Sequence, residues 1–391
     1  MTTWSFFDNL NSVFNLIHNQ STKYLKDLRE MDFILTDNQL FSIKEKVLNN
    51  VRLDADDALL LYNSNDIIGI GHLADFVRRK RHGKKAYFVY NQHLNYTNVC
   101  ITHCRFCAFS RNKGQSGAFT LTIDDVRKKL LDRIDEPITE IHMVGGINPE
   151  LPFEYYLDLL KTIKKIRPNV TIKAFTAVEI AHLAGISSLS LEGTIQILKD
   201  AGLEMVPGGG AEVLSSRVRD KLFPRKIGHE RWLEIVAKIH SAGLTSNATM
   251  LYGHIETRKE RVKHFMHLRT LQDKTNGFTA FIPLAFHSQN TLMSDIPSTT
   301  AFEDLKNIAI ARLMLDNFDH IKAYWVMIGE KLAQAALSFG ADDLDGTIIE
   351  EKITHMAGAT SSKGLTRKKI WRMIQSAGWD PVERDSFYNE I

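Results

Sequence analysis

The chain has 391 residues, of which 49 are basic and 46 acidic, so its formal net charge is only +3. Apolar residues make up 44% and charged residues 24%, which excludes a disordered tail protein, a collagen-like chain and a strongly cationic nucleic-acid binder. No run approaches the roughly 18 apolar residues of a membrane-spanning helix. The amino terminus lacks the pattern of a secretory signal, so we expect a cytoplasmic protein with no membrane span.

Residues 1–85 are charged and follow helical patterns, which predicts an amino-terminal helical extension. The extension closes with a basic run from Arg78 to Arg81. Because the net charge is near zero and the run is isolated, we interpret it as the solvated end of a helix and not as a nucleic-acid site.

From residue 86 onward, short apolar runs alternate with longer amphipathic segments. Strands are predicted at 86–90, 140–144, 171–176, 203–206, 246–252, 278–285, 321–328 and 344–349. Helices are predicted at 124–134, 154–166, 192–201, 230–242, 258–274, 302–317 and 331–339.

This alternation predicts an α/β fold with a parallel sheet, and about eight units favour a TIM-like (β/α) barrel over 86–349. In such barrels the carboxyl ends of the strands carry the active site, and glycine and polar residues gather there in this sequence. Residues 350–391 read as a carboxy-terminal helical tail, with its clearest helix at 365–377.

All three cysteines of the chain, Cys100, Cys104 and Cys107, lie within eight positions of each other directly after the first predicted strand. Three thiolates in a C-x3-C-x2-C loop can hold three irons of a cubane and leave the fourth iron open. A zinc site that uses the cysteines with His103 is the alternative on ligand count.

The cysteine loop, with Phe106 at the aromatic position before its last cysteine, resembles the signature of the radical SAM superfamily. That resemblance implies one [4Fe-4S] cluster whose open iron chelates S-adenosylmethionine (SAM). The pair Gly145 and Gly146 resembles the superfamily's glycines that meet the methionine amino group. An acidic residue usually follows them, whereas Ile147 and Asn148 follow here.

Further residues at strand ends match positions that the superfamily uses for SAM. The resemblance implies contacts to ribose, methionine or adenine for Glu179, Glu212, Gly253 and Glu256. For each carboxylate, the alternative is a charge at a helix amino terminus.

Six segments together resemble the aminofutalosine synthase family of menaquinone biosynthesis: 145–156, 172–180, 207–213, 246–257, 281–287 and 320–327. The likeness runs from about residue 50 to the carboxy terminus. It implies that the 5′-deoxyadenosyl radical adds to the enolpyruvyl double bond of 3-[(1-carboxyvinyl)oxy]benzoate. Rearrangement and decarboxylation then give 6-amino-6-deoxyfutalosine, with methionine released. A one-electron donor such as flavodoxin or ferredoxin would reduce the cluster.

A flat aromatic substrate with two carboxylates calls for cationic or amide groups and aromatic walls. The candidates near strand ends are His254, His287, Arg217, Arg219, Lys322, Tyr324 and Trp325. Asn247 and Thr249 are candidates for contacts to the nucleoside hydroxyls. These assignments rest on position in the sequence alone.

Two other functions stay open. One is the sister enzyme of the same pathway, cyclic dehypoxanthine futalosine synthase, which abstracts hydrogen and releases 5′-deoxyadenosine. Segments 174–179 and 208–211 look like the synthase and not like this cyclase. The other is a zinc-stapled binding protein with a degenerate barrel.

Overall fold

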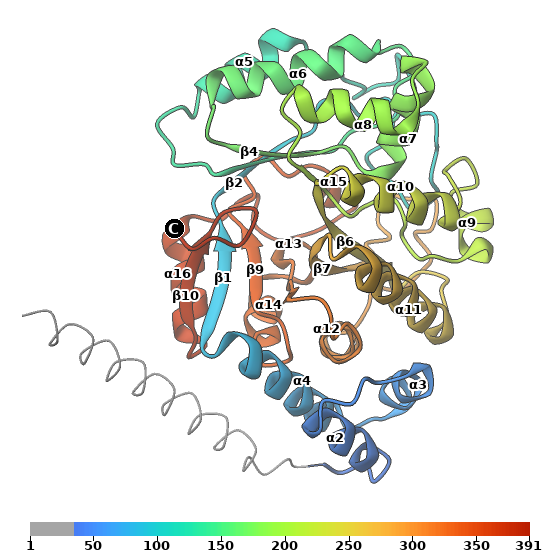
Figure 1. The fold of residues 1–391 in the computed structure, drawn as a ribbon, viewed down its shortest axis with the longest axis vertical. Helices are drawn as coiled ribbons and strands as arrows, with labels where there is room; N and C mark the ends of the chain where they lie inside the picture. Colours follow the sequence, from blue (N-terminus) through green and yellow to red (C-terminus); the bar gives the residue numbers. More distant parts are fainter. Residues whose placement is uncertain (1–34) are drawn as a thin grey trace, which may run out of the picture.

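The computed structural model describes residues 35–391, so the first part of the predicted helical extension lies outside the described residues. The strands are β1 (Lys85–Val89), β2 (Asn91–Leu94), β3 (Glu140–Met143), β4 (Thr171–Ala174), β5 (Met205–Val206), β6 (Thr245–Tyr252), β7 (Phe278–Ala285), β8 (His320–Ile321), β9 (Asp343–Gly346) and β10 (Asp380–Arg384). Seven of them, β2 to β8 in chain order, form one parallel sheet that curls into a half-barrel (Figure 1). The predicted (β/α) barrel fold is confirmed.

Helices surround the curled sheet and cover its outer face (Figure 1). They are α2 (Leu40–Leu48), α3 (Ala55–Asn63), α4 (Ile67–His82), α5 (Ile123–Leu131), α6 (Phe153–Ile166), α7 (Ala177–Ser187), α8 (Leu191–Asp200), α9 (Ser216–Leu222), α10 (His229–Ser241), α11 (Arg258–Thr275), α12 (Ala301–Met314), α13 (Trp325–Ile328), α14 (Glu330–Ala336), α15 (Ile353–Met356) and α16 (Arg367–Ser376). In α6 the buried residues Tyr156, Leu159, Leu160 and Ile163 repeat at helical spacing and form the face that joins the core.

The strand that leads to the cysteines is β2, and not the predicted strand at 86–90. That predicted strand is β1, which pairs in parallel with β9 and β10 in a separate three-stranded sheet. The sequence of β2 is polar although the strand is buried, so it has no apolar run to mark it. The half-barrel therefore has seven strands, where about eight units were predicted.

The stretch 343–349 connects the two edges of the half-barrel. The backbone N–H of Ala323, just after β8, donates to the Asp343 carbonyl at 2.8 Å. At the other edge the N–H of His93 in β2 donates to the Ile349 carbonyl at 2.9 Å. The predicted strand at 344–349 thus contributes β9 to the small sheet and also hydrogen-bonds to both edge strands.

The carboxy-terminal tail holds α15 and α16, as predicted, but it also contains β10, which pairs with β1. The predicted strand at 321–328 is only two residues long and is followed by the short helix α13. The predicted boundaries of the barrel at residues 85 and 349 stay a prediction. In the structure, hydrogen bonds join the segments on the two sides of each boundary.

The basic run at the end of α4 is not simply solvated, which corrects the prediction. Arg78 is fully buried, and its guanidinium donates to the carbonyls of Gly83, Lys85 and Ala341. The same group stacks 3.6 Å from the ring centroid of Trp379. Arg78 therefore joins α4 to the small sheet and the tail. Within residues 35–391 no helix has both the length and the apolar character needed to cross a membrane.

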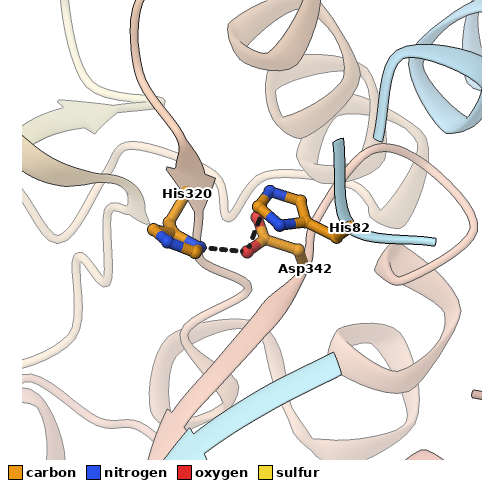
Figure 2. A group of neighbouring side chains, drawn as sticks. All are labelled: His82, His320 and Asp342. Atoms are coloured by element: carbon orange, nitrogen blue, oxygen red, sulfur yellow. Dashed lines mark hydrogen bonds and ion pairs between the residues drawn. The ribbon is translucent and has the colours of Figure 1, made fainter. Parts of the chain in front are cut away.

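A buried polar cluster of His82, His320 and Asp342 lies at the junction of α4, β8 and the small sheet (Figure 2). His320 Nδ1 lies 2.5 Å from one oxygen of Asp342, and His82 Nε2 lies 3.6 Å from it. The other oxygen accepts from the guanidinium of Arg312 and from the N–H of Ile321. The carboxylate of Asp342 is therefore paired with a buried guanidinium as well as with His320.

Candidate active site

The loop after β2 holds the three free cysteines and is fixed by hydrogen bonds from its backbone. The N–H of Cys100 donates to the Arg111 carbonyl at 3.1 Å, and that of Cys107 donates to the Cys104 carbonyl at 3.0 Å. The N–H of Ile147, after β3, donates to Cys100 Sγ at 3.3 Å. A neighbouring strand end therefore orients the first sulfur.

The sulfurs suit a cluster better than a single zinc ion. The Thr102 hydroxyl lies 3.0 Å from Cys100 Sγ and 3.5 Å from Cys104 Sγ, so these two sulfurs are neighbours. The three sulfurs are not all within 4.8 Å of one another, whereas tetrahedral zinc would hold them about 3.8 Å apart. A cubane places each thiolate on a separate iron and spreads them wider. His103, the fourth ligand of the zinc alternative, is exposed.

Burial raises the pKa of the Cys107 thiol to about 11, and it also raises that of Cys104. Without metal these thiols are protonated near neutral pH, so iron must displace their protons on binding. Lys226 lies close enough to favour the thiolate form of both groups, and its ammonium is 5.1 Å from the Phe106 ring centroid. Three converging sulfurs beside a buried cation fit a three-cysteine iron–sulfur cluster.

The glycine pair after β3 packs directly against the cysteine loop. A Cβ on Gly146 would lie 2.2 Å from the Val99 carbonyl oxygen, and one on Gly145 would lie 2.4 Å from the Tyr96 ring. The N–H of Gly145 donates to Glu179 at 3.0 Å, and that of Gly146 donates to the Thr97 carbonyl at 2.9 Å. Because both N–H groups already donate, the glycine pair can offer a ligand only its carbonyl oxygens, which accept from an amino group.

A cavity of about 320 Å³ lies on the inner face of the half-barrel beside the cysteine loop. Its volume is that of a small-molecule site. It is lined by seven residues that the sequence analysis singled out, namely Phe106, Cys107, Glu212, Asn247, Thr249, His287 and Tyr324. Glu212 is held by Lys226 at 2.6 Å, and His287 Nε2 lies 2.9 Å from the Met327 carbonyl.

Other predicted residues lie away from the cavity lining, and each is already bonded. Glu179 accepts hydrogen bonds from Tyr96, Gly145 and Thr176, which makes it a support for the glycine pair. Glu256 accepts from the N–H groups of Gly253 and His254 and pairs with Arg261. Burial raises its pKa, but the contact with the His254 imidazole, followed by the charge of Arg261, holds the pKa down at about 2. These bonds place Glu256 in the turn after β6.

The remaining substrate candidates also lie outside the lining. The side chain of His254 is buried beside Glu256, 2.9 Å from it, and Lys322 lies 3.5 Å from Asp345. Arg217 is exposed and pairs with Glu260, while Arg219 donates to the carbonyls of Pro224 and Lys226. Trp325 is buried and donates its indole N–H to the Gly346 carbonyl.

Several cavity residues were missed by the sequence analysis, among them His93, His142, Lys173, Lys226, Asp345 and Glu351. His93, His142 and Lys173 each occupy the third position of a four-residue strand. In β3 and β4 the flanking residues are apolar, as in Ile141-His142-Met143 and Ile172-Lys173-Ala174. A polar group inside a buried strand is costly without a partner or ligand, and that cost is the signal that could have found them.

Fold and cysteine loop together define an enzyme of the radical SAM class. The family model of the radical SAM superfamily matches residues 94–268, and that of the CofH/MqnC C-terminal region matches 275–391. Among solved structures, methylornithine synthase (PylB) superposes with a TM-score of 0.70 at 15% identity, over 86% of this chain and 96% of that one. At this identity the likeness shows the shared fold alone.

Curated relatives narrow the class. The chain is 46% identical over 361 residues to the aminodeoxyfutalosine synthase of Thermus thermophilus, covering 91% of this chain and 97% of that one. It is 37% identical over 350 residues to the cyclic dehypoxanthine futalosine synthase of Halalkalibacterium halodurans, covering 89% and 94%. The chain belongs to the aminodeoxyfutalosine synthase family.

Proposed function

We propose that this protein joins the adenosyl group of SAM to 3-[(1-carboxyvinyl)oxy]benzoate and yields 6-amino-6-deoxyfutalosine for menaquinone biosynthesis. The main support for this proposal is the 46% identity to an aminodeoxyfutalosine synthase over 361 residues, which include the cysteine loop and the cavity. The cyclase function is disfavoured by the lower identity of 37%.

Cys100, Cys104 and Cys107 would hold one [4Fe-4S] cluster through their thiolates. When bound, the cluster and SAM together supply the 5′-deoxyadenosyl radical that adds to the substrate's double bond. The carbonyls of Gly145 and Gly146 lie beside the loop and would accept from the methionine ammonium. Phe106 lines the cavity at the cysteine side and would form its wall there.

The remaining polar groups of the cavity would fix the nucleoside and exclude water. Asn247 and Thr249 on β6 lie on the wall and would contact ribose hydroxyls, with Thr249 itself fixed to the Gly208 carbonyl at 3.0 Å. Glu212, fixed by Lys226, is a second candidate for the ribose. Glu179, Gly253 and Glu256 act through the turns that they stabilise, as positioning residues.

For the cellular setting we propose the cytoplasm as location and a flavodoxin or ferredoxin as electron donor. The donor is proposed because such a cluster needs a low-potential reductant, and the location because three free cysteines fit a reducing compartment. No nucleic-acid partner is proposed, since the net charge is only +3.

The proposed function is tested by anaerobic incubation of the reconstituted protein with SAM, dithionite and one of two substrates. With 3-[(1-carboxyvinyl)oxy]benzoate, the expected product has the mass of 6-amino-6-deoxyfutalosine. Dehypoxanthine futalosine, the cyclase substrate, is expected to be recovered unchanged. Turnover of the second compound alone would replace the synthase by the cyclase.

A further inference from the structure

Three nitrogen-bearing side chains form a row across adjacent strands on the cavity wall. His93 on β2 pairs in register with His142 on β3, and His142 pairs in register with Lys173 on β4. All three line the cavity. The two imidazoles stack with ring centroids 4.5 Å apart and planes inclined by 15°.

The two imidazoles stack on each other and face the cavity without a charged partner within hydrogen-bond distance among residues 35–391. His93 is 8% exposed and His142 is partly exposed to the cavity, so their ring nitrogens can be reached by a ligand. The Lys173 ammonium forms an ion pair with a Glu140 carboxylate oxygen at 2.7 Å, and Glu140 does not line the cavity. Its ammonium keeps further protons to donate.

Other charges that line the cavity already have partners. Glu212 pairs with Lys226 at 2.6 Å, Glu351 pairs with His355 at 2.6 Å, and Asp345 lies 3.5 Å from Lys322. Within the described part of the chain, the imidazoles of this wall have no such ion pair and are available to a ligand that enters the cavity. Two N–H donors beside an ammonium suit an anionic oxygen group such as a carboxylate.

We propose that His93 and His142, flanked by Lys173, bind the arene carboxylate of the aromatic substrate, an inference that rests on the proposed function. The choice between the substrate's two carboxylates follows from position along the strands. The row lies inside β2, β3 and β4, whereas Cys107 lies on the loop beyond the end of β2. The double bond that reacts must face the cysteine side, which leaves the ring carboxylate, at the other end of the molecule, for the row.

Arg217, Arg219, His254 and Lys322 are absent from the cavity lining, so the row takes over the role that the sequence analysis assigned to them. The assignment also explains why polar side chains occupy buried strand positions.

The first test is a substrate–variant cycle that uses His142→Phe, which keeps a stacked ring and removes the nitrogens. kcat and KM are measured with the full substrate and with its analogue that lacks the ring carboxylate. The wild type is expected to lose about 10- to 100-fold in kcat/KM on the analogue, mainly through KM, because a charge-assisted hydrogen bond is lost. His142→Phe should show little difference between the two compounds, and His142→Gln should restore part of it.

If His142→Phe lowered kcat/KM by the same factor relative to the wild type with the full substrate and with the analogue, the subsite would be overturned. Equal factors would show that His142 has only a structural role. The matched control is His229→Phe, at a histidine outside the cavity that begins α10. It should discriminate between the two compounds as the wild type does.

The second test does not depend on the reaction. Benzoate is titrated into the reconstituted protein and followed by calorimetry. The wild type and His229→Phe should bind it, and His93→Phe and His142→Phe should bind it about tenfold or more weakly. Equal affinity in all four proteins would overturn the subsite even if the synthase reaction occurs. If the wild type makes no product yet the variants lose benzoate, the proposed function fails and the carboxylate site stands.

Discussion

Replacing Gly146 by alanine should damage the cysteine loop without changing any cysteine. The new Cβ would lie 2.2 Å from the Val99 carbonyl oxygen and 2.9 Å from Cys100 Cβ, where ordinary contact begins near 3.4 Å. Because the main obstacle is backbone, no side-chain rotation relieves it, and the loop must move by about 1 Å. Overpacking of this kind costs about 1–3 kcal/mol.

Gly185→Ala is the matched control, because this glycine is exposed in α7 and a Cβ there meets nothing within 4 Å. It should stabilise the protein by about 0.5–1 kcal/mol through helix propensity. The assay combines thermal unfolding with iron content after reconstitution. For a chain of this size the midpoint moves roughly 1 °C per kcal/mol.

We expect Gly146→Ala to melt lower and to hold less iron, and Gly185→Ala to melt slightly higher with full iron. A Gly146→Ala protein with the iron content and stability of the wild type would refute the close packing between the glycine pair and the cysteine loop.

Three more expectations follow from the structure. Changing any of the three loop cysteines to alanine should reduce reconstituted iron well below about four per chain and abolish turnover; iron and sulfide analysis checks this, and a variant with a full active cluster would contradict it. Tyr96→Phe removes the hydroxyl that donates to buried Glu179 at 2.7 Å and should lower the free energy of unfolding by about 1–2 kcal/mol, as measured by urea titration. Burial lowers the pKa of His82 and His240 to about 4 and that of His264 to about 3, below the unfolded value near 6.5. Between these values the unfolded chain binds more protons than the folded one, so the free energy of unfolding is full above pH 6.5 and falls toward pH 4. The fall is up to about 4 kcal/mol per pH unit if all three histidines contribute. Urea midpoints that stay level from pH 7 to 5 would contradict this expectation.

The sequence was sufficient to predict the barrel and to single out the cysteine loop, because both have strong local signals. The alternation of strands and helices is regular, and all three cysteines lie within eight positions. The glycines after β3 were singled out by resemblance, and the structure shows that only glycine permits the close approach to the cysteine loop at Gly146, while their contact with SAM stays a prediction.

The small sheet and the cavity wall could not be predicted in this way. β10 contains Pro381, which is tolerated on an edge strand but argues against a strand when the sequence is taken alone. His93, His142 and Lys173 are far apart in sequence and become a row only through strand register. Arg217 and Arg219 looked suited to a carboxylate by charge, yet their ion pair and carbonyl contacts hold them outside the cavity.

The fate of SAM tests the central claim most directly. SAM labelled in its ribose is turned over anaerobically with the enolpyruvyl benzoate, and product, methionine and 5′-deoxyadenosine are quantified together. If the protein is a synthase, the label enters the product and one methionine is released for each product, with 5′-deoxyadenosine only a minor by-product. Labelled 5′-deoxyadenosine equal to turnover, with an unlabelled product, would contradict the account and show hydrogen abstraction instead.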